Sequence, residues 1–369
     1  MLIFSMLSFL YKWQTFLAHY NLSNSNKEVI ICMTLDLSKY SVRTDLAIES
    51  KAFAEETLGS PISGLMEDIE EHDGIKVTRL DIQNEEASQK IGKIKGHYVT
   101  FEVPGLRTQD TDLQEKVTQS FAKEFAQFLN KIGIKHQAKV LIVGLGNWNV
   151  TPDALGPLVV ENVMVTRHFF ELVPDQVNEG YREVSAVAPG VLGITGIESS
   201  EIVQGIVDRT KPDLIIAIDA LASRSLERVN TTIQVADIGI HPGSGIGNKR
   251  RGLTYEVLGV PCIAIGVPTV CYASTIVNNV FDLMSHHFSA ETGGNQDQSK
   301  QIMGLLTELT ENERLGLVKE VLEPLGHDLI VTPKEIDNFI EDIANIIASG
   351  LNQGLHQAIN GDNVGAYTH

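Results

Sequence analysis

Four short, nearly continuous apolar runs set the strongest limit on how this chain can fold. Such runs are typical of strands in a parallel sheet that helices cover on both faces. Stretches with helical spacing lie between some of them, at 155–170 and 198–209. We therefore predict an α/β fold with a predominantly parallel sheet flanked by helices. The four runs are KVLIVGLG (139–146), PDLIIAID (212–219), TIQVADIGI (232–240) and PCIAIGVP (261–268).

The regions on either side of this pattern have a different character. Residues 75–82 and 96–103 are rich in β-branched and aromatic residues with partial alternation, which predicts antiparallel strands in a small β-rich subdomain around 60–110. From Leu113 onward, apolar residues recur at helical spacing as far as a stop at Gly133. A further helical region is expected around 300–356, near the carboxyl end of the chain.

Composition narrows the class of protein. The chain has 369 residues, of which 43% are hydrophobic and 21% charged, so it can bury a large core. Its net charge of -18, without a basic block, argues against direct binding of nucleic acid. The three cysteines have no CxxC spacing, which favours neither a disulfide framework nor a thiolate zinc site and indicates a reducing, cytoplasmic setting.

The first 32 residues include an apolar run that Lys12 interrupts. The run has no basic residues before it, no small-residue cleavage site after it, and too few residues to span a bilayer, so we expect no membrane association. We interpret residues 1–32 as an extension or a misassigned start, with Met33 as an alternative first residue.

Two acidic residues follow predicted strands at their carboxyl ends, which is where ligands bind and catalytic residues lie in an open α/β sheet. Asp153 follows the first apolar run in a loop before a helix, and Asp219 ends the second run. Either one alone could simply cap backbone amides. If the two strands are neighbours, however, the carboxylates share one crevice and can act as general acid and general base on water that attacks an amide.

Other chemistries have weaker support in the sequence. Gly144 and Gly146 follow a strand as in a dinucleotide fingerprint, but Asn149 occupies the place of the third glycine. Neither HExxH nor GxSxG occurs in the chain. His241 follows a strand in a glycine-rich stretch, where it could hydrogen-bond a catalytic acid or ligate a metal, or serve a structural role only.

Long stretches, in order, resemble the germination protease family of spore-forming bacteria. They are LDLSKYSVRTDLAIES, VGLGNWNVTPDALGP, SAVAPGVLGITGIESSEIV, PDLIIAIDALASRS and IQVADIGIHPGSGIGNKR. The resemblance implies a fold like that of hydrogenase maturation proteases and a homotetramer in the forespore. It implies that Asp153 and Asp219 are the catalytic pair. Related hydrogenase enzymes hold nickel with a histidine, but His241 cannot be matched to it, so no cofactor is expected while a metal is not excluded.

The resemblance also gives a role to residues 44–49, TDLAIE. Enzymes of this family cut small acid-soluble spore proteins after an acidic residue, and they remove their own N-terminal segment. Thr44, Ala47 and Glu49 match the substrate pattern around a scissile bond between Asp45 and Leu46. Residues 33–45 are then a propeptide and 46–369 a single catalytic domain. The residues expected to line the cleft are Gly144, Gly146, Asn147, Gly243 and Gly245.

Two alternatives remain open. The chain could be a maturation-type protease that depends on a metal, or a nucleotide-binding α/β protein without proteolytic activity.

Overall fold

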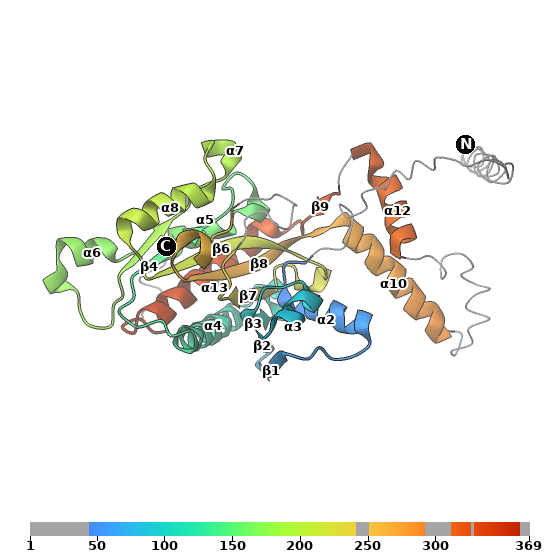
Figure 1. The fold of residues 1–369 in the computed structure, drawn as a ribbon, viewed down its shortest axis with the longest axis horizontal. Helices are drawn as coiled ribbons and strands as arrows, with labels where there is room; N and C mark the ends of the chain where they lie inside the picture. Colours follow the sequence, from blue (N-terminus) through green and yellow to red (C-terminus); the bar gives the residue numbers. More distant parts are fainter. Residues whose placement is uncertain (1–43, 241–250, 292–310, 326–327, 362–369) are drawn as a thin grey trace. The chain divides into compact units, whose positions relative to one another are not determined.

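The computed structural model describes residues 44–240, 251–291, 311–325 and 328–361. Its centre is one nine-stranded sheet in the order β1-β2-β3-β7-β8-β6-β4-β5, with β9 paired to β8 (Figure 1). The α/β fold with a large central sheet flanked by helices is thus confirmed. The strands are β1 (Leu65–His72), β2 (Ile75–Ile82), β3 (Gly96–Glu102), β4 (Val140–Gly144), β5 (Val184–Val187), β6 (Leu214–Ser223), β7 (Thr232–Ala236), β8 (Cys262–Tyr272) and β9 (Ile330–Val331).

The parallel part of the sheet consists of β5, β4, β6 and β8. The apolar run at 232–240 was expected to be a parallel strand, and this prediction is wrong. Its strand, β7, runs antiparallel to both β3 and β8. The physical reason is the connection from β6, which ends at Ser223 and is followed by β7 from Thr232 with only the short helix η5 (Leu226–Arg228) between them. A parallel return needs a crossover of a dozen or more residues.

The β-rich region forms antiparallel pairs, as predicted for 75–82 and 96–103. Its third strand, β1, pairs with β2 at the edge. Pairing of β3 with β7 joins these strands to the same sheet as the parallel strands, so the region extends the central sheet.

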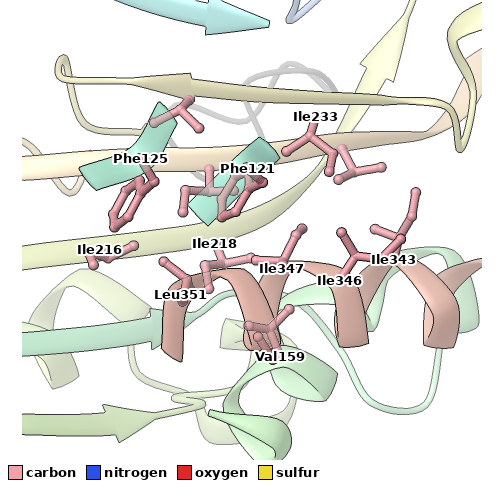
Figure 2. Packing of buried hydrophobic residues seen from close by; sticks show 14 of the residues in the cluster. Phe121, Phe125, Val159, Ile216, Ile218, Ile233, Ile343, Ile346, Ile347 and Leu351 are labelled. Carbon is pink, nitrogen blue, oxygen red and sulfur yellow. The ribbon is translucent and has the colours of Figure 1, made fainter. Parts of the chain in front are cut away.

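One face of the sheet carries the main hydrophobic core. Three helices pack there: α4 (Thr111–Lys131), α5 (Leu155–Asn162) and α13 (Ile336–Leu355). Figure 2 shows Phe121 and Phe125 of α4 and Ile347 of α13 meeting side chains of β6 and β7. Two phenylalanines of α4 lie stacked with ring centroids 5.8 Å apart. This face is therefore closed by close-packed apolar side chains.

The opposite face is covered in two separate places. Over β4 and β6, helices α8 (Ser199–Thr210) and α9 (Tyr255–Leu258) form one cluster. Over β2, β3 and β7, helices α2 (Ala47–Leu58) and α3 (Glu85–Ile91) form another. The two clusters are distinct, and the part of the sheet between them is where the candidate site lies.

The remaining helices flank these layers. Helix α12 (Glu311–Leu322) packs on α10 (Ala273–Glu291) through Val318 and Leu322. The stretch at 155–170, expected to be one helix, is two: α5 ends at Asn162 and α6 spans Arg167–Leu172. One further short helix is α7 (Leu192–Thr195). Within the described ranges, no helix is both long and apolar enough to cross a bilayer.

Candidate active site

Asp153 and Asp219 both lie near the carboxyl end of β4. Their strands β4 and β6 are parallel neighbours, so the condition set by the sequence for a shared crevice is met. Asp219 is a buried residue in β6, one position after Ile218, which pairs with the last residue of β4. Asp153 lies in η3 (Thr151–Asp153), which lies against the ends of β6 and β8.

Two glycines allow the loop after β4 to bring Asp153 back to the strand end. Gly146 has φ +117°, and a Cβ there would lie 1.9 Å from the carbonyl oxygen of Asp153 and 3.5 Å from its carboxyl carbon. The amide of Asn147 donates to that same carbonyl oxygen at 2.9 Å. Gly144 lies against Gly156 of α5, where a Cβ would meet the backbone at 2.2 Å. These residues act by permitting close backbone approach.

A row of paired residues runs across the sheet from Asp219. Asp219 of β6 pairs with Gly266 of β8, and Gly266 pairs with Gln234 of β7. Directly paired residues point to the same face, so Asp219 and Gln234 face the same side, with the side-chain-free Gly266 between them. The side chain of Leu221 fills the space over Gly266, where a Cβ would meet it at 2.4 Å.

A cavity of about 310 Å³ lies on this face, between the two helical clusters. It has polar and apolar walls, and β6, β7, β8 and the turn after α3 all contribute. The lining residues are Asp45, Gly92, Lys93, Ile94, Tyr98, Leu221, Gln234, Ala236, Ile238, Gly239, Ile240, Ala264 and Gly266.

The expected processing segment forms part of the wall of this cavity, through Asp45. The amide of Asp45 donates to the carbonyl of Ala222 at 3.0 Å, and the amide of Ala222 donates to the Asp45 carboxylate at 2.9 Å. Ala222 follows an irregularity in the register of β6, between Leu221 and Ala222. Leu46 is fully buried and directly precedes α2. The Asp45–Leu46 peptide is therefore bound by the strand that carries Asp219.

Glu49 fixes the segment on its other side. Its carboxylate accepts the backbone amides of Arg224 at 2.7 Å and Ser225 at 2.9 Å, and it pairs with Arg228 at 3.3 Å. The hydroxyl of Thr44 donates to the same carboxylate. Ala47 and Glu49 lie in the first turn of α2.

Two side chains contact the carbonyl oxygen of Asp45. The ammonium group of Lys93 donates to it at 2.9 Å and to the carbonyl oxygen of Thr44 at 3.0 Å. The amide nitrogen of Gln234 donates to the Asp45 oxygen at 3.4 Å, while its amide oxygen accepts the backbone N–H of Ala47 at 2.7 Å. The oxygen that belongs to the expected scissile bond thus has two donors.

The structure thus brings the predicted residues 44–49 against β6, in which Asp219 lies within the strand and not at its end, and neither Asp153 nor Asp219 is among the residues that line the cavity. Gly144, Gly146 and Asn147 are not among the residues that line the described cavity, because they make the turn that holds Asp153. His241, Gly243 and Gly245 lie outside the described residues.

Sequence reasoning missed Lys93 and Gln234. Gln234 carried a usable signal, a polar residue inside the apolar run TIQVA. Lys93 carried none, because nothing in GKIKGH separates it from Lys95.

A metal centre was left open by the sequence. Across the part of the chain that the structure describes, no group of three or more His, Cys, Asp and Glu side chains is placed to hold a metal ion. Cys262 and Cys271 are buried free thiols, and burial raises the pKa of Cys262 to about 12. Neither cysteine has the thiolate character of a nucleophile.

Comparison with known proteins gives long matches. The sequence model of a family described as "Germination protease" matches residues 42–297 and 290–368. Germination proteases of Bacillus cytotoxicus and Bacillus licheniformis are 53% and 52% identical to the chain over 364 residues, covering 91% of it and 99% of each relative. A solved [NiFe] hydrogenase maturation protease, HycI from Thermococcus kodakarensis KOD1, matches 36% of the chain and 74% of its own length, at 22% identity and a TM-score of 0.23.

Proposed function

The chain belongs to the germination protease family and is a peptidase, and we propose that it is made as a zymogen that cleaves its own Asp45–Leu46 bond. The observation that carries this proposal is the position of that bond. It lies beside a cavity on the sheet face of Asp219, with backbone and side-chain groups bound on both sides of it. Residues 45 and 46 precede the helix α2, and a main-chain hydrogen bond from Asp45 to Ala222 holds them against β6.

Asp153 and Asp219 act together in this proposal as general acid and general base. Two carboxyl groups in close contact disfavour double ionisation, so in this proposal one retains a proton while the other is charged. The ionised carboxylate takes a proton from water, and the protonated one gives its proton to the departing amide nitrogen. The pair is assigned jointly, without a choice of which residue is acid and which is base.

Latency follows from the same contacts. While Thr44 and Asp45 occupy the hydrogen-bonding groups of Ala222, Lys93 and Gln234, no other peptide can bind them. Leu46 is fully buried, which contributes roughly 1.5–3 kcal/mol to keeping the segment docked. The Leu221 side chain over Gly266 lies in the row between Asp219 and Gln234, and we propose that it separates water at the acid pair from the bond. Acidification then favours processing, because it populates the singly protonated pair.

After loss of propeptide residues 33–45, the groups that held Thr44 and Asp45 take other peptides with an acid before an aliphatic residue. The resemblance of this segment to the family's substrates supports small acid-soluble spore proteins as the targets; we place self-processing in the forespore cytoplasm and cleavage of these proteins in the spore core during germination. No cofactor, nucleic acid or membrane takes part in the proposed reaction.

We propose a homotetramer as the working form. Apolar side chains stand exposed on α10, at Val280 and Leu283, and on α12, at Leu317 and Val321. Association of copies of the chain would cover them. Light scattering of the purified protein tests this, and a monomer at working concentration would contradict it.

The acid pair is tested by Asp153→Asn and Asp219→Asn, which keep the shape of each side chain. We expect both variants to fold and neither to process itself or cut a peptide of residues 40–50. Near-wild-type cleavage by either variant removes that residue from the pair. Wild-type activity that survives exhaustive chelation separates this chemistry from a metal-dependent protease, which would lose activity and regain it with nickel or zinc.

A further inference from the structure

We propose that Lys93 and Gln234 are the donors that bind the carbonyl oxygen at the scissile bond and stabilise the negative charge that develops on it. This inference rests on the proposed cleavage between Asp45 and Leu46. No sequence motif points to either residue, and the two come from separate elements, the turn after α3 and strand β7.

The backbone of Lys93 is held by contacts that do not involve residues 44–49. Helix α3 ends at Gly92, which has φ +70°. The amide of Lys93 donates to the carbonyl of Ser88 at 3.2 Å, and the hydroxyl of Ser88 donates to the carbonyl of Lys93 at 2.7 Å. A backbone held at both ends orients the side chain, and such preorganised donors are what stabilise an oxyanion effectively.

The partners of Lys93 are informative. Burial of the ammonium group lowers the pKa of Lys93, although the nearby carboxylates of Asp45 and Glu49 oppose this shift. Within the described residues, its hydrogen-bond acceptors are the carbonyl oxygens of Thr44 and Asp45, both of which belong to the segment that processing removes. A buried cation is costly unless it is paired, so the vacated site attracts another carbonyl or developing anion.

Gln234 forms hydrogen bonds with the segment on both sides of the Asp45–Leu46 bond. Its amide nitrogen reaches the oxygen of Asp45 at 3.4 Å, before the bond, and its amide oxygen accepts the N–H of Ala47 at 2.7 Å, after it. The side chain therefore sets the orientation of the peptide relative to Asp219, which lies in the same row of the sheet. Thr44 assists, because its hydroxyl oxygen accepts the N–H of Leu46 at 3.1 Å.

With Lys93 and Gln234 as donors, the proposed hydrolysis can be written atom by atom. The water oxygen bonds to the carbonyl carbon of Asp45, its proton passes to the ionised aspartate, and the π electron pair of the carbonyl moves onto the oxygen that Lys93 and Gln234 hold. When the intermediate collapses, that pair re-forms the C=O bond and the C–N bond breaks. The nitrogen of Leu46 takes the proton of the other aspartate, giving a carboxyl group at Asp45 and an amine at Leu46.

The test uses two reactions of the same protein. Self-processing of the full chain is followed by intact mass, and cleavage of a synthetic peptide of residues 40–50 by the processed enzyme gives kcat and KM. The variants are Lys93→Met, Lys93→Arg and Gln234→Glu, which keeps the acceptor for Ala47 but replaces the donor. Lys95→Met is the matched control, since Lys95 is an exposed lysine two residues away. Hydrogen exchange of the Asp45 amide shows whether each uncleaved variant keeps the segment docked.

We expect Lys93→Met to lower kcat by about 100-fold or more and Gln234→Glu by about 10-fold or more, with KM little changed. Lys93→Arg should restore part of the rate. The wild-type rate should also fall as pH rises through the pKa of Lys93. The rate of the arginine variant should not fall in this way, because its guanidinium group stays charged. Lys95→Met should match the wild type.

The remaining outcomes overturn the inference, and they separate it from the proposed function. If the wild type cuts both substrates and Lys93→Met has a kcat within about three-fold of it, Lys93 is not a donor in the reaction and the proposed function stands. A raised KM with unchanged kcat assigns Lys93 to binding alone. If the wild type cuts neither its own chain nor the peptide, the proposed function fails and the inference fails with it.

Discussion

Ala222 holds Asp45 through two hydrogen bonds. The carbonyl oxygen of Ala222 accepts the backbone amide of Asp45 at 3.0 Å, and the amide of Ala222 donates to the Asp45 carboxylate at 2.9 Å. Ala222 lies three residues after Asp219 in β6, so the recognition of an acid and the candidate catalytic acid belong to one strand. The proposed specificity for an acid before the scissile bond would therefore have a physical origin in this backbone N–H, which needs an anionic or strongly accepting partner.

Asp45→Lys should abolish self-processing, because an ammonium group cannot accept the Ala222 N–H and would lie beside Lys93. Asp45→Asn, which retains an accepting oxygen, should process more slowly than the wild type. Intact mass against time measures both. A chain made to begin at Leu46 lacks residue 45 altogether, and its peptidase activity should equal that of the naturally processed enzyme. Efficient processing of the lysine variant would show that cleavage does not require an acidic residue at position 45.

Glu49→Ala should destabilise the unprocessed protein by roughly 2–4 kcal/mol, because two backbone amides and Arg228 lose a charged acceptor. Chemical unfolding at neutral pH measures this difference. Glu56→Gln is the control, since Glu56 lies exposed on the same helix and should change the free energy of unfolding little. Equal stability of the two variants would mean that the Glu49 contacts do not hold the segment.

Leu221→Ala should speed self-processing at neutral pH, because it removes the side chain that fills the space over Gly266 between Asp219 and Gln234. The rate constant from intact mass, compared with the wild type at the same pH, decides this. A slower or unchanged rate would mean that Leu221 plays no part in latency.

Part of the fold could be predicted from the sequence because strands that are buried on both faces need apolar residues at nearly every position. Strands β4, β6 and β8 are covered on both faces, and each appears as a continuous apolar run. The direction of β7 could not be read, since its run is equally apolar in either orientation. Strand β1 was missed because it is an exposed edge strand with the sequence LMEDIEEH, whose acidic residues read as a solvated loop.

The candidate site also has parts that the sequence predicts and parts that it does not. Asp153 and Asp219 could be predicted from the sequence because ligands and catalytic groups collect at the carboxyl ends of strands in this topology. The start of α2 at Ala47 could not, because Leu46 before it supplies no capping side chain and tertiary contacts hold the first turn. Lys93 reaches Asp45 across 48 positions of sequence, through a contact that depends on how α3 packs over β3 and β7. Such contacts exist only after the sheet order is known.

His356 should make the folded state less stable in acid. It is fully buried, its Nδ1 accepts the amide of Arg182 at 3.1 Å, and burial, with Arg182 nearby, lowers its pKa to about 4. Between pH 6.5 and about 4 the unfolded chain takes up a proton that the folded chain excludes, so stability is full above pH 6.5 and falls with pH. The loss from this group should approach about 3 kcal/mol at the acid limit.

Urea unfolding at a series of pH values measures that dependence. His356→Gln offers an acceptor without a titrating group, so its unfolding free energy should vary less between pH 6.5 and 4. His136→Gln, at an exposed histidine, should keep the wild-type slope. If the wild type and His356→Gln have the same slope, the buried histidine does not cause the acid sensitivity.

Self-cleavage between Asp45 and Leu46 is tested most directly by intact-mass analysis of the full chain during incubation at mildly acidic pH, with Asp219→Asn alongside. We predict that the wild type loses mass in one step to a species that begins at Leu46, and that the variant stays intact. A wild-type chain that remains uncleaved, or a product that begins at another residue, would contradict it.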